Sequence, residues 1–187
     1  MTKQINTFII TGGPGTGKTT ITEELKRRGY YCVDEVARQI IKEQVENNGD
    51  ALPWANKEKY TYLMLERSID TFIENKNNSS IIFFDRGIPD TLAYANLIKL
   101  KIFPELTQAI RSYRYNSIAF ILPPWKEIYQ TDSERKQTVE EAIEVYNTLK
   151  ETYTECEYQL IEIPKADIKE RVDFILSVIN EENKFNL

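Results

Sequence analysis

The stretch "TGGPGTGKTT", residues 11–20, joins the apolar segment "TFII" to the helix-like segment "ITEELKRRG". It contains the pattern G-x-x-x-x-G-K-T, which is typical of a phosphate-binding loop between a strand and a helix. Glycines let consecutive backbone N–H groups turn toward an anion, and the following helix presents the positive end of its dipole. The sequence therefore predicts a nucleotide-binding P-loop formed by Gly12, Gly13, Pro14, Gly15, Thr16, Gly17, Lys18, Thr19 and Thr20.

Two residues of this loop carry specific chemistry. Lys18 is expected to reach the β- and γ-phosphates of a nucleotide, and the hydroxyl of Thr19 is expected to ligate Mg²⁺. A turn with a purely structural role needs one or two glycines, whereas this one has four and is followed by Lys-Thr. ATP is the default donor, because "NKEK" at Asn56 lacks the acid of the guanine-specific pattern N-K-x-D.

Composition limits the classes of protein to which the chain can belong. Its 187 residues, 41% of them hydrophobic, predict a single domain over residues 1–187. No apolar run approaches the roughly 20 residues of a membrane helix, so we expect a cytoplasmic protein without a membrane-spanning segment. The net charge of −5 argues against general nucleic-acid binding. Cys32 and Cys156 lack metal-like spacing and are expected to be buried or incidental thiols.

The chain contains no histidine. A Ser-His-Asp triad and a histidine-ligated metal are therefore excluded. Any acid–base chemistry must be carried out by carboxylates, lysines or tyrosines.

Strand and helix patterns alternate along the chain. We expect strands at residues 5–11, 30–35, 81–85, 117–122 and 158–164, and helices at residues 17–28, 35–49, 56–76, 88–101, 138–155 and 166–182. The helix at 56–76 places Tyr62, Leu65, Phe72 and Ile73 at helical spacing, so these side chains are predicted to be core, and residues 183–187 are expected to fray. Five strand–helix units predict an α/β P-loop NTPase with a doubly wound, five-stranded parallel sheet that binds ligands at the carboxyl ends of its strands.

Charged residues follow the third predicted strand in "FFDRG". Asp85 at the end of a buried strand would be costly without a partner, and Mg²⁺ is the natural one in a P-loop protein. The alternative is that Asp85 caps the next helix. Hydrolytic P-loop ATPases commonly place a second acid here, whereas Arg86 suits a phosphate or another anionic group of a substrate. Asp90 is a further candidate for contact with the acceptor.

The second predicted strand ends in "VDEVAR". Glu35 could accept a proton from an acceptor hydroxyl, and Arg38 could hold the acceptor or the transferring phosphoryl group. The alternative is that Asp34 and Glu35 simply begin a helix.

A polar segment follows the fourth predicted strand. Residues 124–137 carry Lys126, Arg135 and Lys136, and such a segment in a P-loop protein could act as a lid that closes over the γ-phosphate. The alternative is an ordinary solvated loop.

The segments "FIITGGPGTGKTT", "VDEVARQII", "FFDRGIPDTLAY" and "LPPWKEIYQTDSERKQTVEEA" resemble a family of small P-loop proteins. These are classed as AAA-type ATPases and are related to the nicotinamide riboside kinase domain of the bifunctional NAD-biosynthesis regulator. More distantly, the chain is similar to nucleoside and nucleoside monophosphate kinases.

The resemblance to these kinases implies an acceptor-side base after strand two and an acid–Arg pair after strand three, which match Glu35 and Asp85-Arg86. The lid departs from the several arginines of those kinases, since it has Arg135 beside Lys136. We find no sensor arginine region and no second helical domain, so a ring-forming remodelling ATPase is not expected.

The preferred hypothesis is a Mg²⁺- and ATP-dependent phosphotransferase that acts on a small hydroxyl-bearing acceptor, such as a nucleoside or riboside. Its expected catalytic residues are Lys18, Glu35, Asp85 and Arg135, its acceptor contacts Glu35, Arg38, Arg86 and Asp90, and its Mg²⁺ ligands Thr19 and Asp85. The alternative is a nucleotide-binding regulator that acts through a protein or lipid partner, although no particular partner is predicted. A polynucleotide kinase would need a basic channel that this acidic chain does not indicate.

Overall fold

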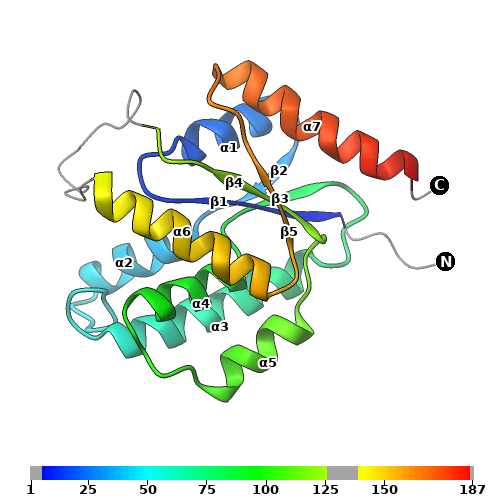
Figure 1. Cartoon of the computed structure of the whole chain (residues 1–187). Helices are drawn as coiled ribbons and strands as arrows, with labels where there is room; N and C mark the ends of the chain where they lie inside the picture. The colour runs from blue at the N-terminus through cyan, green and yellow to red at the C-terminus, as the bar shows by residue number, and fades with distance from the viewer. Residues whose placement is uncertain (1–5, 126–138, 186–187) are drawn as a thin grey trace.

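The computed structural model describes residues 6–125 and 139–185, and its elements alternate as the sequence predicts (Figure 1). The strands are β1 (Thr7–Gly12), β2 (Tyr31–Val33), β3 (Ile82–Asp85), β4 (Ile118–Leu122) and β5 (Gln159–Glu162). The helices are α1 (Lys18–Arg27), α2 (Val36–Glu46), α3 (Lys57–Asn75), α4 (Ile88–Leu97), α5 (Pro104–Ser112), α6 (Val139–Glu155) and α7 (Ile168–Phe185).

The strands form one parallel sheet in the order β2-β3-β1-β4-β5. This confirms the predicted five-stranded parallel sheet. Every residue of the central strand β1 is buried, as is typical of a parallel strand covered on both faces. Its end at Gly12 lies between Asp85 of β3, which pairs with Ile10, and Leu122 of β4, which pairs with Gly12 itself. The loop after β1 therefore emerges where the carboxyl ends of three strands meet.

Helices cover both faces of the sheet (Figure 1). On one face, α1 and α7 pack on a cluster that includes Phe8, Phe83 and Phe120. On the other face, α3, α4, α5 and α6 pack around a cluster that includes Ile9 and Phe84. Full burial of such a side chain contributes about 1.5–3 kcal/mol, so these layers hold the strand ends in place.

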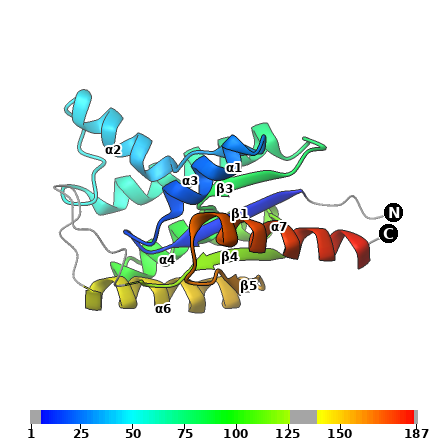
Figure 2. The ribbon, with the colours of Figure 1, turned by 90° about the horizontal axis from the view of Figure 1, so that it is seen from above.

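Helix α2 lies outside these layers and packs on α3 through a smaller cluster. Ile40, Tyr60 and Met64 are its buried members. Viewed from above, α2 and α3 lie toward the β3 side of the sheet and α6 toward the β5 side (Figure 2). In the described part of the chain, no helix has the length and apolar character needed to cross a bilayer.

The helix predicted over residues 88–101 is present but shorter, and the helix that follows it was not predicted. Helix α4 ends at Leu97, Lys99 adopts a left-handed conformation with φ 54°, and a second helix, α5, begins at Pro104. Proline is favoured in the first turn of a helix because its missing N–H would have no partner there. Leu106 and Ala109 are the buried residues of α5.

Three smaller expectations also differ from the structure. Tyr62 and Ile73 are 44% and 43% exposed rather than core, and Tyr62 stacks on Phe103 with ring centroids 4.0 Å apart. Helix α2 ends at Glu46 rather than near Gly49, and α7 continues to Phe185 through residues expected to fray. Helical spacing alone does not say where the apolar face of a helix ends.

Gly12 is required by its surroundings, and Gly29 provides a matched control. Both have positive φ, 148° and 90°, but a Cβ at Gly12 would lie 2.9 Å from Cβ of Leu122, whereas a Cβ at Gly29 would meet nothing within 4 Å. We expect Gly29→Ala to lower the free energy of unfolding by about 1–2 kcal/mol through backbone strain. Gly12→Ala should lose about 1–3 kcal/mol more through overpacking, as measured by urea denaturation. Equal losses would contradict this account.

Candidate active site

The loop predicted to bind phosphate has the backbone geometry that its glycines allow. Gly15 and Gly17 have φ values of 72° and 89°, and Gly17 occupies the N-cap position of α1. The hydroxyl of Thr16 donates to the carbonyl of Gly13 at 2.9 Å and closes the turn. The N-terminus of α1 is therefore presented at the end of β1, where backbone N–H groups and the helix dipole favour an anion.

Lys18 is buried within this loop. Its ammonium group donates to the carbonyls of Gly12 and Gly13 at 2.9 and 3.1 Å. Burial, and next the charge of Arg86, lower the pKa of Lys18 to about 8, while nearby carboxylates oppose the shift. Lys18 thus carries a positive charge at neutral pH, held by two carbonyl groups and favoured by the charges of Glu35, Asp85 and Asp90. A bound polyphosphate would add a stronger counter-charge.

Arg171 of α7 supports the same loop, and sequence reasoning missed it. Its Nη2 donates to the carbonyl of Thr16 at 3.0 Å, and its guanidinium carbon lies 5.7 Å from the ring centre of Trp125. The side chain is 4% exposed although it is charged. The one signal in the sequence that could have identified Arg171 is its place next to Val172, among the apolar positions of an amphipathic helix.

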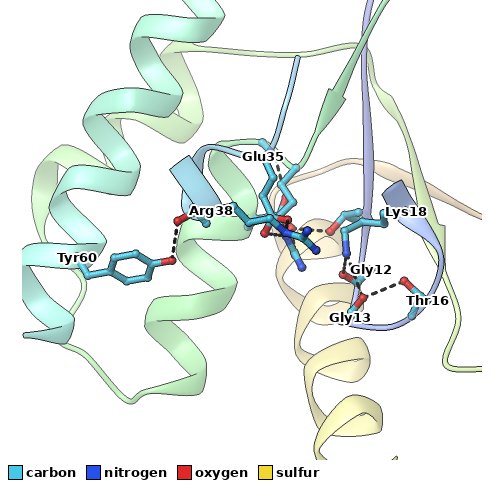
Figure 3. Close-up of polar contacts among 12 residues, drawn as sticks. Gly12, Gly13, Thr16, Lys18, Glu35, Arg38 and Tyr60 are labelled. Atoms are coloured by element: carbon cyan, nitrogen blue, oxygen red, sulfur yellow. Dashed lines mark hydrogen bonds and ion pairs between the residues drawn. The ribbon is translucent and has the colours of Figure 1, made fainter. Parts of the chain in front are cut away.

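Glu35 lies at the start of α2 and faces the phosphate loop (Figure 3). Its side chain does not cap the helix. Instead it accepts from Nε of Arg86 at 2.9 Å and from Nε of Arg38 at 3.0 Å. Burial alone would raise the pKa of Glu35, but the charges of Arg86, Lys18 and Arg38 outweigh it and lower the pKa to about 2. Glu35 is therefore a carboxylate at all physiological pH values.

Asp85 ends β3 beside the loop. Its Oδ1 is buried and has no hydrogen-bond partner among the described residues. Burial raises the pKa of Asp85, against the charges of Lys18 and Arg86. The N-cap of α4 is Gly87, so the alternative that Asp85 caps this helix is excluded.

The surroundings of Asp85 fit a Mg²⁺ ion held jointly with a nucleotide. An orphaned carboxylate oxygen suits such an ion, and Thr19 lies exposed in the first turn of α1. In the described residues there is no group of three metal-binding side chains. Mg²⁺ usually keeps several waters and binds through one or two protein oxygens and the phosphates, so such a group is not needed.

Asp90 lines the pocket, where its predicted contact with the acceptor stays a prediction, and it is held by several protein donors. Its carboxylate is buried and accepts from Thr11 Oγ1 at 2.5 Å, Arg86 Nη1 at 3.0 Å, the Gly87 amide at 2.9 Å, and the hydroxyl of Tyr153. Four protein donors already occupy the two oxygens. Asp90 is therefore a positioning residue that holds Arg86.

Arg86 connects these carboxylates. Burial acts to lower its pKa, but the charges of Glu35, Asp90 and Asp85 raise the pKa above the usual value. Its backbone has φ 73°, a left-handed conformation that costs roughly 1–2 kcal/mol for a residue other than glycine. The strained backbone and the two ion pairs together aim the guanidinium between Glu35 and Asp90.

A pocket opens between the start of α2, helix α3 and the loop after β3. The predicted residues Glu35, Asp85, Arg86 and Asp90 all line it. Arg38 does not, and its side chain is 54% exposed. The predicted lid, with Lys126, Arg135 and Lys136, lies outside the described residues.

Comparison with solved structures defines the class of fold. Deoxyadenosine kinase from M.mycoides is similar over 94% of this chain and 99% of its own, with TM-score 0.63 and 18% identity. The NadR protein in complex with NR is similar over 95% of this chain and 51% of its own, with TM-score 0.69 and 18% identity. Shikimate kinase from Acinetobacter baumannii is similar over 96% of each chain, with TM-score 0.56 and 14% identity. At these identities the likeness establishes the P-loop kinase fold.

The sequence itself identifies the family. The model of a family of AAA domains matches residues 7–171, and the chain belongs to this family. A search of curated proteins finds no match.

The lowered pKa of Lys18 predicts how the affinity for ATP depends on pH. Below about pH 8 the ammonium is charged in the free protein, so affinity should be nearly constant. Above it, binding must take up a proton, and affinity should fall by up to tenfold per pH unit, because a terminal phosphate with a second pKa of about 6 is already ionised. Calorimetry between pH 7 and 9.5, in buffers of different ionisation enthalpy, measures both affinity and proton uptake. Constant affinity without proton uptake would contradict the assignment of Lys18.

The hydroxyl of Tyr153 can be tested against that of Tyr158. The first donates to the buried carboxylate of Asp90, whereas the second accepts from the Tyr115 amide at 3.4 Å. We expect Tyr153→Phe to lower the free energy of unfolding by about 1.5–3 kcal/mol, and Tyr158→Phe by about 0.5–1.5 kcal/mol, because hydrogen bonds to charged groups are stronger. Urea denaturation distinguishes the two, and a larger loss for Tyr158→Phe would refute the role given to Asp90.

Proposed function

We propose that this chain is an ATP-dependent kinase that transfers the γ-phosphoryl group of Mg·ATP to a small hydroxyl-bearing acceptor, such as a nucleoside or riboside. The observation that carries the proposal is the pocket beside the phosphate loop, lined by the ionised Glu35 and by the orphaned carboxylate of Asp85. A hydrolytic ATPase needs no acceptor pocket at this place. The P-loop kinase fold agrees with the proposal.

The residues divide between the two substrates. The loop from Gly12 to Thr20 would bind the phosphates, with Lys18 on the β- and γ-phosphates. Thr19 and Asp85 would hold Mg²⁺, which when bound neutralises charge on the phosphates. Glu35 and Arg86 would face the acceptor, and Arg38 would lie at the rim.

In the transfer step, the acceptor oxygen forms a bond to the γ-phosphorus while the bond from that phosphorus to the β,γ-bridging oxygen breaks. The electron pair of the broken bond goes to ADP, and the hydroxyl proton goes to Glu35. A pKa of about 2 makes Glu35 a weak base. Proton transfer therefore comes late in the step, which suits a loose transition state.

Glu35→Gln tests this assignment, with Glu43→Gln as a matched control. Glu43 lies on the same helix and pairs with Arg67 at 2.9 Å, but it does not line the pocket. We expect Glu35→Gln to keep Mg·ATP binding and to lose at least about 10²-fold in acceptor-dependent phosphorylation, since a positioned base contributes 10²–10⁴-fold. Glu43→Gln should keep the wild-type rate. The assay scores acceptor-dependent release of ADP across a panel of nucleosides and ribosides.

Two results would count against these roles. Wild-type transfer by Glu35→Gln would remove Glu35 as the base and leave Asp85 as the next carboxylate to test. If no hydroxyl compound stimulates ADP release by the wild-type protein, the kinase assignment is wrong and the nucleotide-binding regulator takes its place.

A further inference from the structure

The pocket beside the phosphate loop carries information on the charge of its ligand. It is an open depression, with about 370 Å³ of space when the solvent at its mouth is counted. Val33, Phe84 and Met64 give it an apolar part, and Ser68 and Thr71 of α3 add hydroxyl groups. Its charged side is formed where the β2–α2 and β3–α4 connections meet.

That side is dominated by carboxylates. In the part of the chain that the structure describes, Arg86 is the one cationic residue that lines the pocket. The acidic lining residues are Asp34, Glu35, Asp85 and Asp90. The pocket therefore contrasts with sites for phosphates and carboxylates, which are built around uncommitted arginines or lysines.

The charge of Arg86 is already balanced by two carboxylates. Its Nε is 2.9 Å from Glu35 and its Nη1 is 3.0 Å from Asp90, while its side chain is only 20% exposed. The cations near the mouth are also paired, since Lys26 lies 2.6 Å from Asp34 and Arg38 lies 3.0 Å from Glu35. These ion pairs weaken the attraction of Arg86 for an anionic group of the substrate, and its predicted contact with such a group stays a prediction.

An anionic acceptor would meet two obstacles in this pocket. Its charge would lie among carboxylates, beside an arginine whose charge two of them already balance, or it would have to draw Arg86 away from Glu35 or Asp90. The second course would leave a buried carboxylate unpaired, which is strongly unfavourable. Both obstacles act against the charged form and leave a neutral hydroxyl compound unaffected, so the pocket discriminates by repulsion.

Building on the proposed function, we propose that the acceptor is an uncharged or cationic hydroxyl compound and that this pocket rejects acceptors carrying a phosphate or carboxylate group. The fold alone does not make this choice, because it is similar to that of deoxyadenosine kinase, shikimate kinase and thymidylate kinase. The selection against anionic acceptors depends on the carboxylates of the lining and on their pairing with Arg86.

Matched acceptors that differ by one phosphate test the proposal on the wild-type chain. The pairs are adenosine and AMP, thymidine and thymidylate, and nicotinamide riboside and its mononucleotide, with shikimate as the carboxylate probe. Calorimetry measures binding without nucleotide, and ADP release measures transfer with Mg·ATP. We expect the unphosphorylated member of at least one pair to bind, and at least tenfold more tightly than its monophosphate.

The outcomes separate the two proposals. Tighter binding or faster phosphorylation of a monophosphate or shikimate would overturn the charge preference and leave the kinase assignment standing. Binding of neutral compounds without transfer would support the charge preference and overturn the kinase assignment. If no compound of any pair binds, the pocket is not an acceptor site and the inference is wrong.

Thr71→Lys, with Thr71→Gln as its uncharged control, tests the cause of the preference. The lysine adds an uncommitted cation to the lining at the partly buried Thr71. We expect the ratio of monophosphate to nucleoside affinity to rise at least tenfold in Thr71→Lys and to stay within twofold of wild type in Thr71→Gln. A folded Thr71→Lys without this shift would refute electrostatic exclusion.

Salt dependence gives a second test that needs no variant. Exclusion by charge is weakened by screening, whose length falls from about 10 Å at 0.1 M to about 3 Å at 1 M ionic strength. The discrimination against the monophosphate should therefore decrease as salt increases. Discrimination that does not change with salt would indicate exclusion by shape and would overturn the electrostatic proposal.

Discussion

The guanidinium of Arg86, held between the carboxylates of Glu35 and Asp90, fixes the geometry of the candidate site. A buried ion pair contributes little net stability, but removing one partner is costly because it leaves a charge uncompensated. The relative positions of these three side chains are therefore more tightly constrained than those of apolar neighbours would be. Through Asp90 the same network reaches Thr11 of β1 and Tyr153 of α6. The phosphate loop and the pocket are thus positioned by one set of hydrogen bonds.

The features predicted well from the sequence are local ones. The glycine spacing of residues 12–17 specifies a P-loop, and unbroken apolar runs specify buried parallel strands. The end of α4 was placed too late because it depends on the left-handed Lys99, which the helical pattern does not reveal. Helix α5 lies in residues 102–116, for which no element was predicted from the sequence. The exposure of Tyr62 depends on its stacking against Phe103, a partner from another segment.

The sequence predicted where the candidate site lies, but it did not predict which of its charged side chains pair with one another. Glu35 and Asp85 were found because the carboxyl ends of neighbouring parallel strands converge. The partners of these residues could not be read, because Glu35 and Arg86 lie 51 positions apart and Thr11 and Asp90 lie 79 apart. An arginine after β3 suggests an anionic ligand only when it is uncommitted. The number of carboxylates that reach Arg86 became apparent only from the folded chain.

The contact of Arg171 with Thr16 spans 155 positions of the sequence. A ribosome makes the glycine-rich loop first, and the arginine that supports it is added 155 residues later. Contacts of such separation form late because closing the intervening chain costs entropy. An incomplete chain therefore has the nucleotide-binding motif but lacks one of its supports. The phosphate loop therefore reaches its full set of contacts only after α7 has been made.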